Sequence, residues 1–169
     1  MIIETERLIL RPWKEEDAKC LYHFAKNPKI GPVAGWPPHK SVEESLEIIT
    51  TIFNKKETYA ITIDNKAVGC IGLLFYPDTN HDWPDEGVEL GYWIGEEYWG
   101  QGLVVEGTKE VIKHAFEDLD IDKIYASFKC ENKQSKRVLE KLGFEYHSDL
   151  RKADYTGEEF DQTAMVLEK

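Results

Sequence analysis

The fold is decided by one stretch of the chain, Glu89-Leu-Gly-Tyr-Trp-Ile-Gly-Glu-Glu-Tyr-Trp-Gly-Gln-Gly-Leu-Val-Val-Glu-Gly107. Its first part, Leu90 to Ile94, is apolar and aromatic and predicts a strand. From Leu103 onward, apolar residues recur at spacings of three and four, which predicts a helix. The turn between the two contains Gly100 and Gly102, which can adopt backbone conformations that other residues avoid.

A strand, a glycine turn and a helix in this order point free backbone N–H groups at one spot. Because the first N–H groups of a helix lack partners and the helix dipole is positive there, the turn is expected to bind an anion, most often phosphate. The turn lacks the Lys-Ser/Thr ending of a nucleoside-triphosphate loop, which argues against a Mg-nucleotide. It also lacks the G-x-G-x-x-G motif, because Val105 stands at the position of the last glycine. A turn of this kind can also be only a tight connection.

A second motif follows about thirty residues later, at residues 131–144, which read Glu-Asn-Lys-Gln-Ser-Lys-Arg-Val-Leu-Glu-Lys-Leu-Gly-Phe. Together the two segments resemble the GNAT superfamily of acyl-CoA-dependent N-acyltransferases. They are most similar to its RimJ/RimL-like branch of ribosomal-protein N-terminal acetyltransferases, in which W-G-x-G precedes N-x-x-S-x-R-V-L-E-K-x-G-F. The opening segment, Thr5 to Pro12, is also similar to that branch, so the resemblance covers almost the whole chain.

The resemblance implies an α+β GNAT fold with a mixed, mostly antiparallel sheet of seven strands. The sheet would be splayed between its fourth and fifth strands and flanked by about four helices, in a single domain of residues 1–169. The hydrophobic pattern predicts strands at 2–11, 57–64, 67–76, 87–94, 123–129, 144–150 and 161–167, and helices at 15–26, 41–55, 102–117 and 132–142. Residues 27–40 and 77–86 are expected to be loops.

The composition fits an enzyme of the cytoplasm. The chain has 169 residues, of which 41% are hydrophobic, and no apolar run approaches the ~20 residues needed to span a bilayer. The N-terminus shows no signal-peptide pattern. Cys20, Cys70 and Cys130 show neither disulfide nor zinc spacing, and no metal site is expected. The sequence is compatible with a monomer or a homodimer.

The net charge of −11, from 21 Lys and Arg against 32 Asp and Glu, argues against a general nucleic-acid surface. It is compatible with a cationic acceptor such as an amine, and equally with a role in solubility alone.

For the cofactor, the resemblance implies acetyl-CoA, with its pyrophosphate bound by the backbone amides of the turn, namely those of Trp99, Gly100, Gln101, Gly102, Leu103 and Val104. The family usually has Gly or Ala at Val104, so its bulk is expected to narrow the turn. Backbone groups of Trp93 and Ile94 would pair with the pantetheine arm like a substitute strand. The side chain of Trp93 could equally be a core aromatic. Gly95 is expected to mark a bulge that opens the sheet.

Asn132 and Ser135 lie on one face of a first helical turn. The resemblance implies that Asn132 binds pantetheine and that Ser135 lies near the sulfur, where its hydroxyl could protonate the departing thiolate. Asn132 also suits a helix N-cap. Other branches of the family use a Tyr at the position of Leu139, which cannot donate a proton. Lys136 and Arg137 could meet the 3′-phosphate or simply be solvated.

A base is also needed, because alkyl amines with a pKa near 10 are mostly protonated at neutral pH. Glu89 is the preferred candidate, either directly or through water, although a salt-bridged strand Glu is the alternative reading. The rival bases are Glu106, His39 and His81, the first of which could instead serve the helix dipole or the turn. Cys130 could be acylated as a nucleophile, but a packed strand cysteine fits it better.

The sequence therefore predicts an N-acetyltransferase in which an amine, either a protein N-terminus or a small molecule, attacks acetyl-CoA directly in a ternary complex. Two alternatives remain: a non-catalytic acyl-CoA sensor or interaction module, and a nucleotide-binding enzyme that uses the glycine turn.

Overall fold

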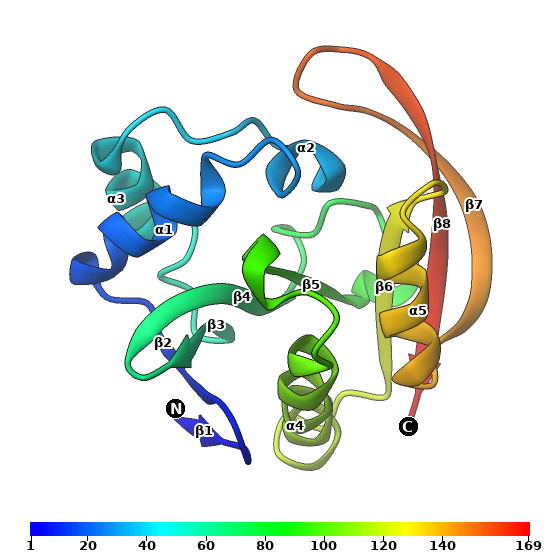
Figure 1. The fold of residues 1–169 in the computed structure, drawn as a ribbon. Coiled ribbons are helices and arrows are strands. Elements are labelled where there is room, and N and C mark those ends of the chain that lie inside the picture. Colours follow the sequence, from blue (N-terminus) through cyan, green and yellow to red (C-terminus); the bar gives the residue numbers. More distant parts are fainter.

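The computed structural model describes all residues, 1–169, and places every strand in one sheet (Figure 1). The eight strands lie in the order β1-β2-β3-β4-β5-β6-β8-β7. Their bounds are Ile3–Glu4 (β1), Ile9–Pro12 (β2), Thr58–Ile63 (β3), Lys66–Leu74 (β4), Val88–Ile94 (β5), Lys123–Lys129 (β6), Glu145–Ala153 (β7) and Glu159–Glu168 (β8). The helices are Ala18–Ala25 (α1), Gly31–Ala34 (α2), Val42–Thr51 (α3), Leu103–Glu117 (α4) and Lys133–Lys141 (α5), with short 3₁₀ turns at Glu15–Asp17 (η1), Pro84–Glu86 (η2) and Glu96–Tyr98 (η3).

Helices cover both faces of the sheet, with α1 and α3 on one side and α4 on the other (Figure 1). On β5, Val88, Leu90 and Ile94 alternate toward α4 and belong to the main core cluster. The helix packs closely on the sheet because Gly107 has no side chain; a Cβ there would lie 3.0 Å from Ile71. No helix of the protein is both long enough and apolar enough to cross a membrane.

The sheet opens between β5 and β6. The two strands are parallel and pair only at Val88↔Ile124 and Glu89↔Tyr125. Beyond Glu89, β5 stays paired with β4 on its other side as far as Ile94. From Leu90 onward, one edge of β5 therefore has no strand beside it, which confirms the splay expected from the family resemblance.

The α+β class is confirmed, but the element counts differ from the expected seven strands and about four helices. Residues 2–11 were expected as one strand and form two, because a turn between Thr5 and Leu8 interrupts them. In that turn the Thr5 N–H donates to the Leu8 carbonyl at 2.9 Å, and the Leu8 N–H donates to the Thr5 hydroxyl at 3.0 Å. The expected loop 27–40 contains the one-turn helix α2, which ends at Gly35 in the left-handed conformation.

The expected bulge at Gly95 is wrong. The register between β4 and β5 runs without a shift from Leu74↔Glu89 to Gly69↔Ile94. Gly95 is needed for a different reason, since a Cβ at this position would collide with the ring of Phe24 on α1. The glycine therefore lets α1 approach the end of β5.

Candidate active site

The turn before α4 presents a row of free backbone N–H groups. Gly100 and Gly102 have φ values of +74° and +73°, which confirms the expected use of glycine. Gly102 is the N-cap of α4, and its carbonyl accepts the first helical hydrogen bond, from the Glu106 N–H at 3.0 Å. The N–H groups from Gly100 to Val105 have no acceptor within the protein. This arrangement suits an anion at the positive end of a helix.

Side chains from the N-terminal segment hold this turn in place. The Arg7 guanidinium donates to the Gln101 carbonyl at 2.9 Å and to the Glu106 carboxylate at 2.7 Å. The Thr5 hydroxyl donates to the same carboxylate at 2.6 Å. Burial raises the pKa of Glu106, but the hydrogen bonds from Thr5 and Arg7 outweigh it and the pKa is lowered. Glu106 is thus linked to the turn through Arg7, in line with the alternative that it serves the turn.

The other residues of the turn face in different directions. The Trp99 indole N–H donates to the Ile94 carbonyl at 3.0 Å and closes the turn onto the end of β5. Leu103 and Val104 lie in the main core cluster. The bulk of Val104 is therefore packed inside the protein, and the expected narrowing of the turn does not occur. Gln101 is exposed, so only its backbone is positioned for a ligand.

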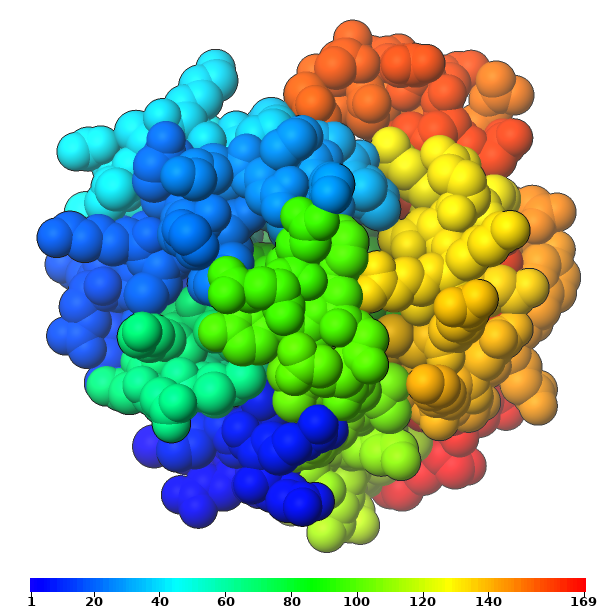
Figure 2. All heavy atoms as spheres, viewed as in Figure 1, coloured from blue at the N-terminus to red at the C-terminus, as the bar shows by residue number.

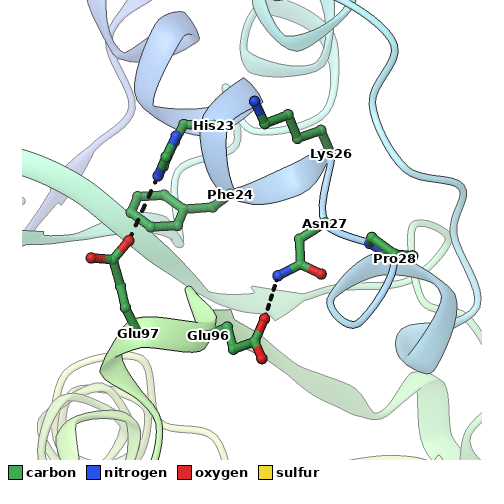
Figure 3. Close-up of a pocket in the computed structure, with 7 residues that line it drawn as sticks. All are labelled: His23, Phe24, Lys26, Asn27, Pro28, Glu96 and Glu97. Atoms are coloured by element: carbon green, nitrogen blue, oxygen red, sulfur yellow. Dashed lines mark hydrogen bonds and ion pairs between the residues drawn. The ribbon is translucent and has the colours of Figure 1, made fainter.

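The end of α1 packs against η3, at the start of this turn (Figure 3). Asn27 donates to Glu96 at 2.7 Å, and His23 lies 3.6 Å from Glu97. Hydrogen bonds, first from Lys29 and then from Asn27, lower the pKa of Glu96. The open pocket here is lined mostly by polar side chains and lies beside the turn, not in the gap between β5 and β6. The contacts of Asn27 and His23 with Glu96 and Glu97 hold η3, and with it the start of the turn, against α1.

The gap between β5 and β6 has a hydroxyl pair on the α4 side. The Tyr92 hydroxyl on β5 lies 2.7 Å from the Ser135 hydroxyl on α5 and also donates to the Ser135 carbonyl at 3.2 Å. The Asn132 side chain accepts from the Ser135 N–H at 3.1 Å, which confirms its N-cap reading. Burial raises the pKa of Tyr92, and the bond with Ser135 partly opposes this. Tyr92 was missed as a site residue, although its alternation with Leu90 and Ile94 along β5 already placed it on this face.

Two other predicted residues of this helix lie at its surface, since Lys136 and Arg137 are exposed. Leu139, at the position where other branches have Tyr, is buried in the core. On the opposite face of β5, the Trp93 ring packs with those of Trp13 and Trp36, at centroid distances of 6.4 and 6.2 Å. The core-aromatic reading of its side chain is correct, and its backbone still lies along the open edge.

Glu89 lies at the point where the two strands part, and it is buried, with 3% of its surface exposed. Its carboxylate accepts three N–H groups: the Asn80 backbone at 2.7 Å, the Asn80 side chain at 2.9 Å and the Trp83 indole at 2.8 Å. Both donating residues belong to the loop between β4 and β5. The Trp83 ring stacks on Tyr125 at 4.8 Å. Glu89 therefore anchors this loop over the sheet.

The other candidates for a base or nucleophile occupy different places. His39 Nδ1 lies 2.8 Å from the hydroxyl of Ser45 on α3, and burial lowers the His39 pKa. His81 Nε2 lies 3.2 Å from the hydroxyl of Ser127 on β6. Cys130 is exposed, with its Sγ 3.5 Å from the Thr163 hydroxyl. The structure brings together no three His, Cys, Asp or Glu side chains that could hold a metal ion.

Three segments that are distant in the sequence thus meet on one face of the molecule (Figure 2): the α1–α2 region in blue, the β5–α4 turn in green and the β6–α5 region in yellow. The open edge of β5, the amide row and the Tyr92–Ser135 pair lie where these segments join.

Comparison with known proteins agrees with this geometry. Residues 7–145 match the model of the acetyltransferase (GNAT) domain. The chain is 27% identical to the uncharacterized N-acetyltransferase YoaA of Bacillus subtilis, over 99% of this chain and 97% of that protein. It is 26% identical to the ribosomal-protein-serine acetyltransferase of Escherichia coli, over 95% and 92% of the two chains.

Among solved structures, the fold is similar to that of the microcin C7 self-immunity acetyltransferase MccE in complex with acetyl-CoA and AMP. The TM-score is 0.80 at 21% identity, over 97% of this chain and 93% of that one. The matched domain, the splayed sheet and the amide turn before α4 lead to one conclusion: the chain belongs to the GNAT family of acyl-CoA-dependent N-acetyltransferases.

Proposed function

We propose that this chain is a single catalytic domain that transfers the acetyl group of acetyl-CoA to a primary amine, by direct attack in a ternary complex. The observation that carries the proposal is the row of unpaired N–H groups from Gly100 to Val105, next to the open edge of β5. The turn would bind the pyrophosphate, as helix N-termini bind phosphate generally. The open edge, with Trp93 and Ile94, would pair with the pantetheine arm.

Ser135 is the proposed donor of a proton to the leaving thiolate. It lies at the first turn of α5, across the gap from β5, and its hydroxyl shares a hydrogen bond with Tyr92. A hydroxyl pair supplies a second proton source behind the first, so that the Ser135 oxygen need not stay charged. Asn132 fixes the start of α5 through its cap bond and so fixes the position of Ser135.

Proton removal from the amine is assigned to the opposite face of the gap, where Glu89 and the loop that it anchors lie. The thiolate would therefore gain its proton on one face of β5, and the amine would lose its proton on the other. Backbone N–H groups on the open edge would stabilise the charge that develops on the acyl oxygen.

For the acceptor we propose a protein N-terminus, because a relative of this chain is named a ribosomal-protein-serine acetyltransferase. The net charge of −11 supports a cationic acceptor. The three cysteines form no disulfide, which supports the cytoplasm, where thiols stay reduced, as the place of the reaction.

Two measurements test the proposal. Thermal shift with acetyl-CoA, CoA, ATP and NAD should show stabilisation by the two CoA species alone, since a ligand stabilises only the fold that binds it. Release of free thiol is then followed with a panel of acceptors: peptides that begin with Ser or Ala, free amino acids and small primary amines. Binding of CoA without turnover of any amine would favour an acyl-CoA sensor, and stabilisation by ATP or NAD would favour a nucleotide enzyme.

A further inference from the structure

The face of β5 that is turned away from α4 borders an open space. Glu89, Gly91 and Trp93 alternate along this face. A Cβ added at Gly91 would meet no atom within 4 Å, so no protein atom fills the space beside Gly91, just where the strands part. The last paired residues are Glu89 and Tyr125, and continuing the same register places Ser127 of β6 across from Gly91.

Polar groups gather on the β6 side of this space. His81 Nε2 lies 3.2 Å from the Ser127 hydroxyl. Gln162 of β8 lies beside His81, and the residue is more than nine-tenths buried. The Gln162 carbonyl oxygen, Oε1, makes no well-formed hydrogen bond in the protein, although it faces the His81 ring closely enough to raise the His81 pKa. An unpaired buried acceptor is costly, so a ligand with N–H groups would satisfy it.

Glu89 is poorly placed to take a proton itself. A carboxylate offers about four acceptor sites, and three N–H groups already occupy Glu89. The donating residues, Asn80 and Trp83, stand on either side of His81 in the chain. By holding both of them, Glu89 fixes the position of His81 over Ser127.

Building on the proposed function, we propose that this space binds the primary ammonium group of the acceptor and that His81 takes its proton. Gln162 Oε1 accepts one ammonium N–H, and Glu89 is a positioning residue that acts through the His81 loop. Gly91 leaves the room that the incoming nitrogen needs.

The protons balance as follows. His81 takes one proton from the ammonium group, and the freed lone pair forms the bond from nitrogen to the acyl carbon. When the bond from that carbon to sulfur breaks, the nitrogen gives its second proton to water, the sulfur gains one from Ser135, and water reprotonates Ser135. His81 then gives its proton to water, so that one amide, one thiol and one solvent proton result.

The surroundings of His81 favour the neutral form of its ring, chiefly through burial. Burial lowers the His81 pKa below its ordinary value of 6.5, and Lys152 of β7 adds to this. Glu89, a hydrogen bond with Gln162 and Asp82 act in the opposite direction but do not cancel the burial. A neutral imidazole can accept a proton, whereas an imidazolium cannot.

The test compares His81→Asn, Glu89→Gln and a control, His147→Asn, with the amine that the wild-type protein acetylates fastest in the panel above. His147 is exposed and packs edge-on against Tyr125, so its removal disturbs the same aromatic cluster without touching the space. We expect His81→Asn to lower kcat/KM at pH 7 by roughly 10²-fold with an unchanged Kd for acetyl-CoA. The control should remain near the wild-type rate.

The pH profile of kcat/KM separates a base from a structural residue. In the wild type, the rate should fall only as pH drops through the lowered pKa of His81. In His81→Asn, the fall should move up to the pKa of the amine, because only acceptor that is already neutral can react. Glu89→Gln should lower the rate but keep the wild-type profile.

Gln162→Leu gives a second readout. It should raise KM for the amine and leave kcat within a few-fold, because it removes a contact with the bound ammonium group. If His81→Asn keeps the wild-type profile, or if Glu89→Gln is the variant that loses it, the assignment to His81 is overturned. A wild-type protein that acetylates none of the amines overturns the proposed function itself, and the subsite with it.

Discussion

The Tyr92 hydroxyl on β5 lies 2.7 Å from the Ser135 hydroxyl on α5 and bridges the two elements that border the gap in the sheet. The pair ties the first turn of α5 to β5 at the level where the strands have already parted. Its position, on the α4 side of the strand, is opposite to that of Glu89 and His81. The proposed proton donor to the thiolate and the proposed base for the amine therefore lie on opposite sides of the β5 backbone.

We expect Ser135→Ala to lower kcat by roughly 10²-fold with little change in the Kd for acetyl-CoA, because it removes the proposed proton donor. Tyr92→Phe should lower kcat less, since Ser135 keeps its own proton. The double variant should be no worse than Ser135→Ala, because the two hydroxyls act as a unit. Additive losses in kcat would show that Tyr92 and Ser135 act separately.

The amide turn leads to a prediction about cofactor affinity. Gly102→Val should weaken CoA binding strongly, because a β-branched side chain cannot readily adopt φ near +73° and would crowd the approach to the N–H groups. The matched control is Gly157→Val in the β7–β8 hairpin, which has φ of +85° and no atom near its Cβ position. Calorimetry on folded protein gives both affinities, and an equal loss in the two variants would contradict the assignment of the turn.

Arg7, from the N-terminal segment, is expected to stabilise the conformation of the same turn. Arg7→Gln removes the bonds to the Gln101 carbonyl and the Glu106 carboxylate, so the turn should loosen and CoA affinity should fall by several-fold. Arg151→Gln on β7 is the control, because it makes the same change in net charge at an exposed ion pair with Glu159. A similar loss of affinity in both variants would point to long-range charge alone.

Much of this architecture could be predicted from the sequence because its signals are local. The positive φ at Gly100 and Gly102, the helix that follows them and the cap at Asn132 are properties of a few consecutive residues. The turn at Thr5 to Leu8 was missed, although residues 4–7 are all polar, because the apolar residues on either side of it predict one strand. It depends on a Thr hydroxyl that is also bound to Glu106, a hundred residues away.

The chemistry of the gap was harder to predict because it depends on pairs that only the fold brings together. Nothing in the sequence shows that Asn80 and Trp83 would donate three hydrogen bonds to Glu89, or that Ser127 would face His81. From the sequence, Glu89 is the preferred base, and Glu106, His39 and His81 are its rivals. Their hydrogen-bond partners distinguish them, and those partners come from other elements.

The last prediction concerns the order of events. Direct attack by the amine requires no acyl-enzyme, so incubation with acetyl-CoA alone should leave the intact mass of the protein unchanged. Cys130 is the cysteine to watch, because it is exposed. Cys70 is inert by comparison, since burial raises the pKa of its thiol to about 12.

Intact mass spectrometry of the wild type, Cys130→Ala and Cys20→Ala gives the answer. The wild type should show no acetyl adduct, and Cys130→Ala should acetylate the amine at the wild-type rate. An adduct that appears within one turnover and is lost only in Cys130→Ala would replace direct transfer by a two-step reaction through the thiol. An adduct that forms much more slowly than turnover would be a side reaction of an exposed cysteine, and it would leave the ternary complex as the reactive species.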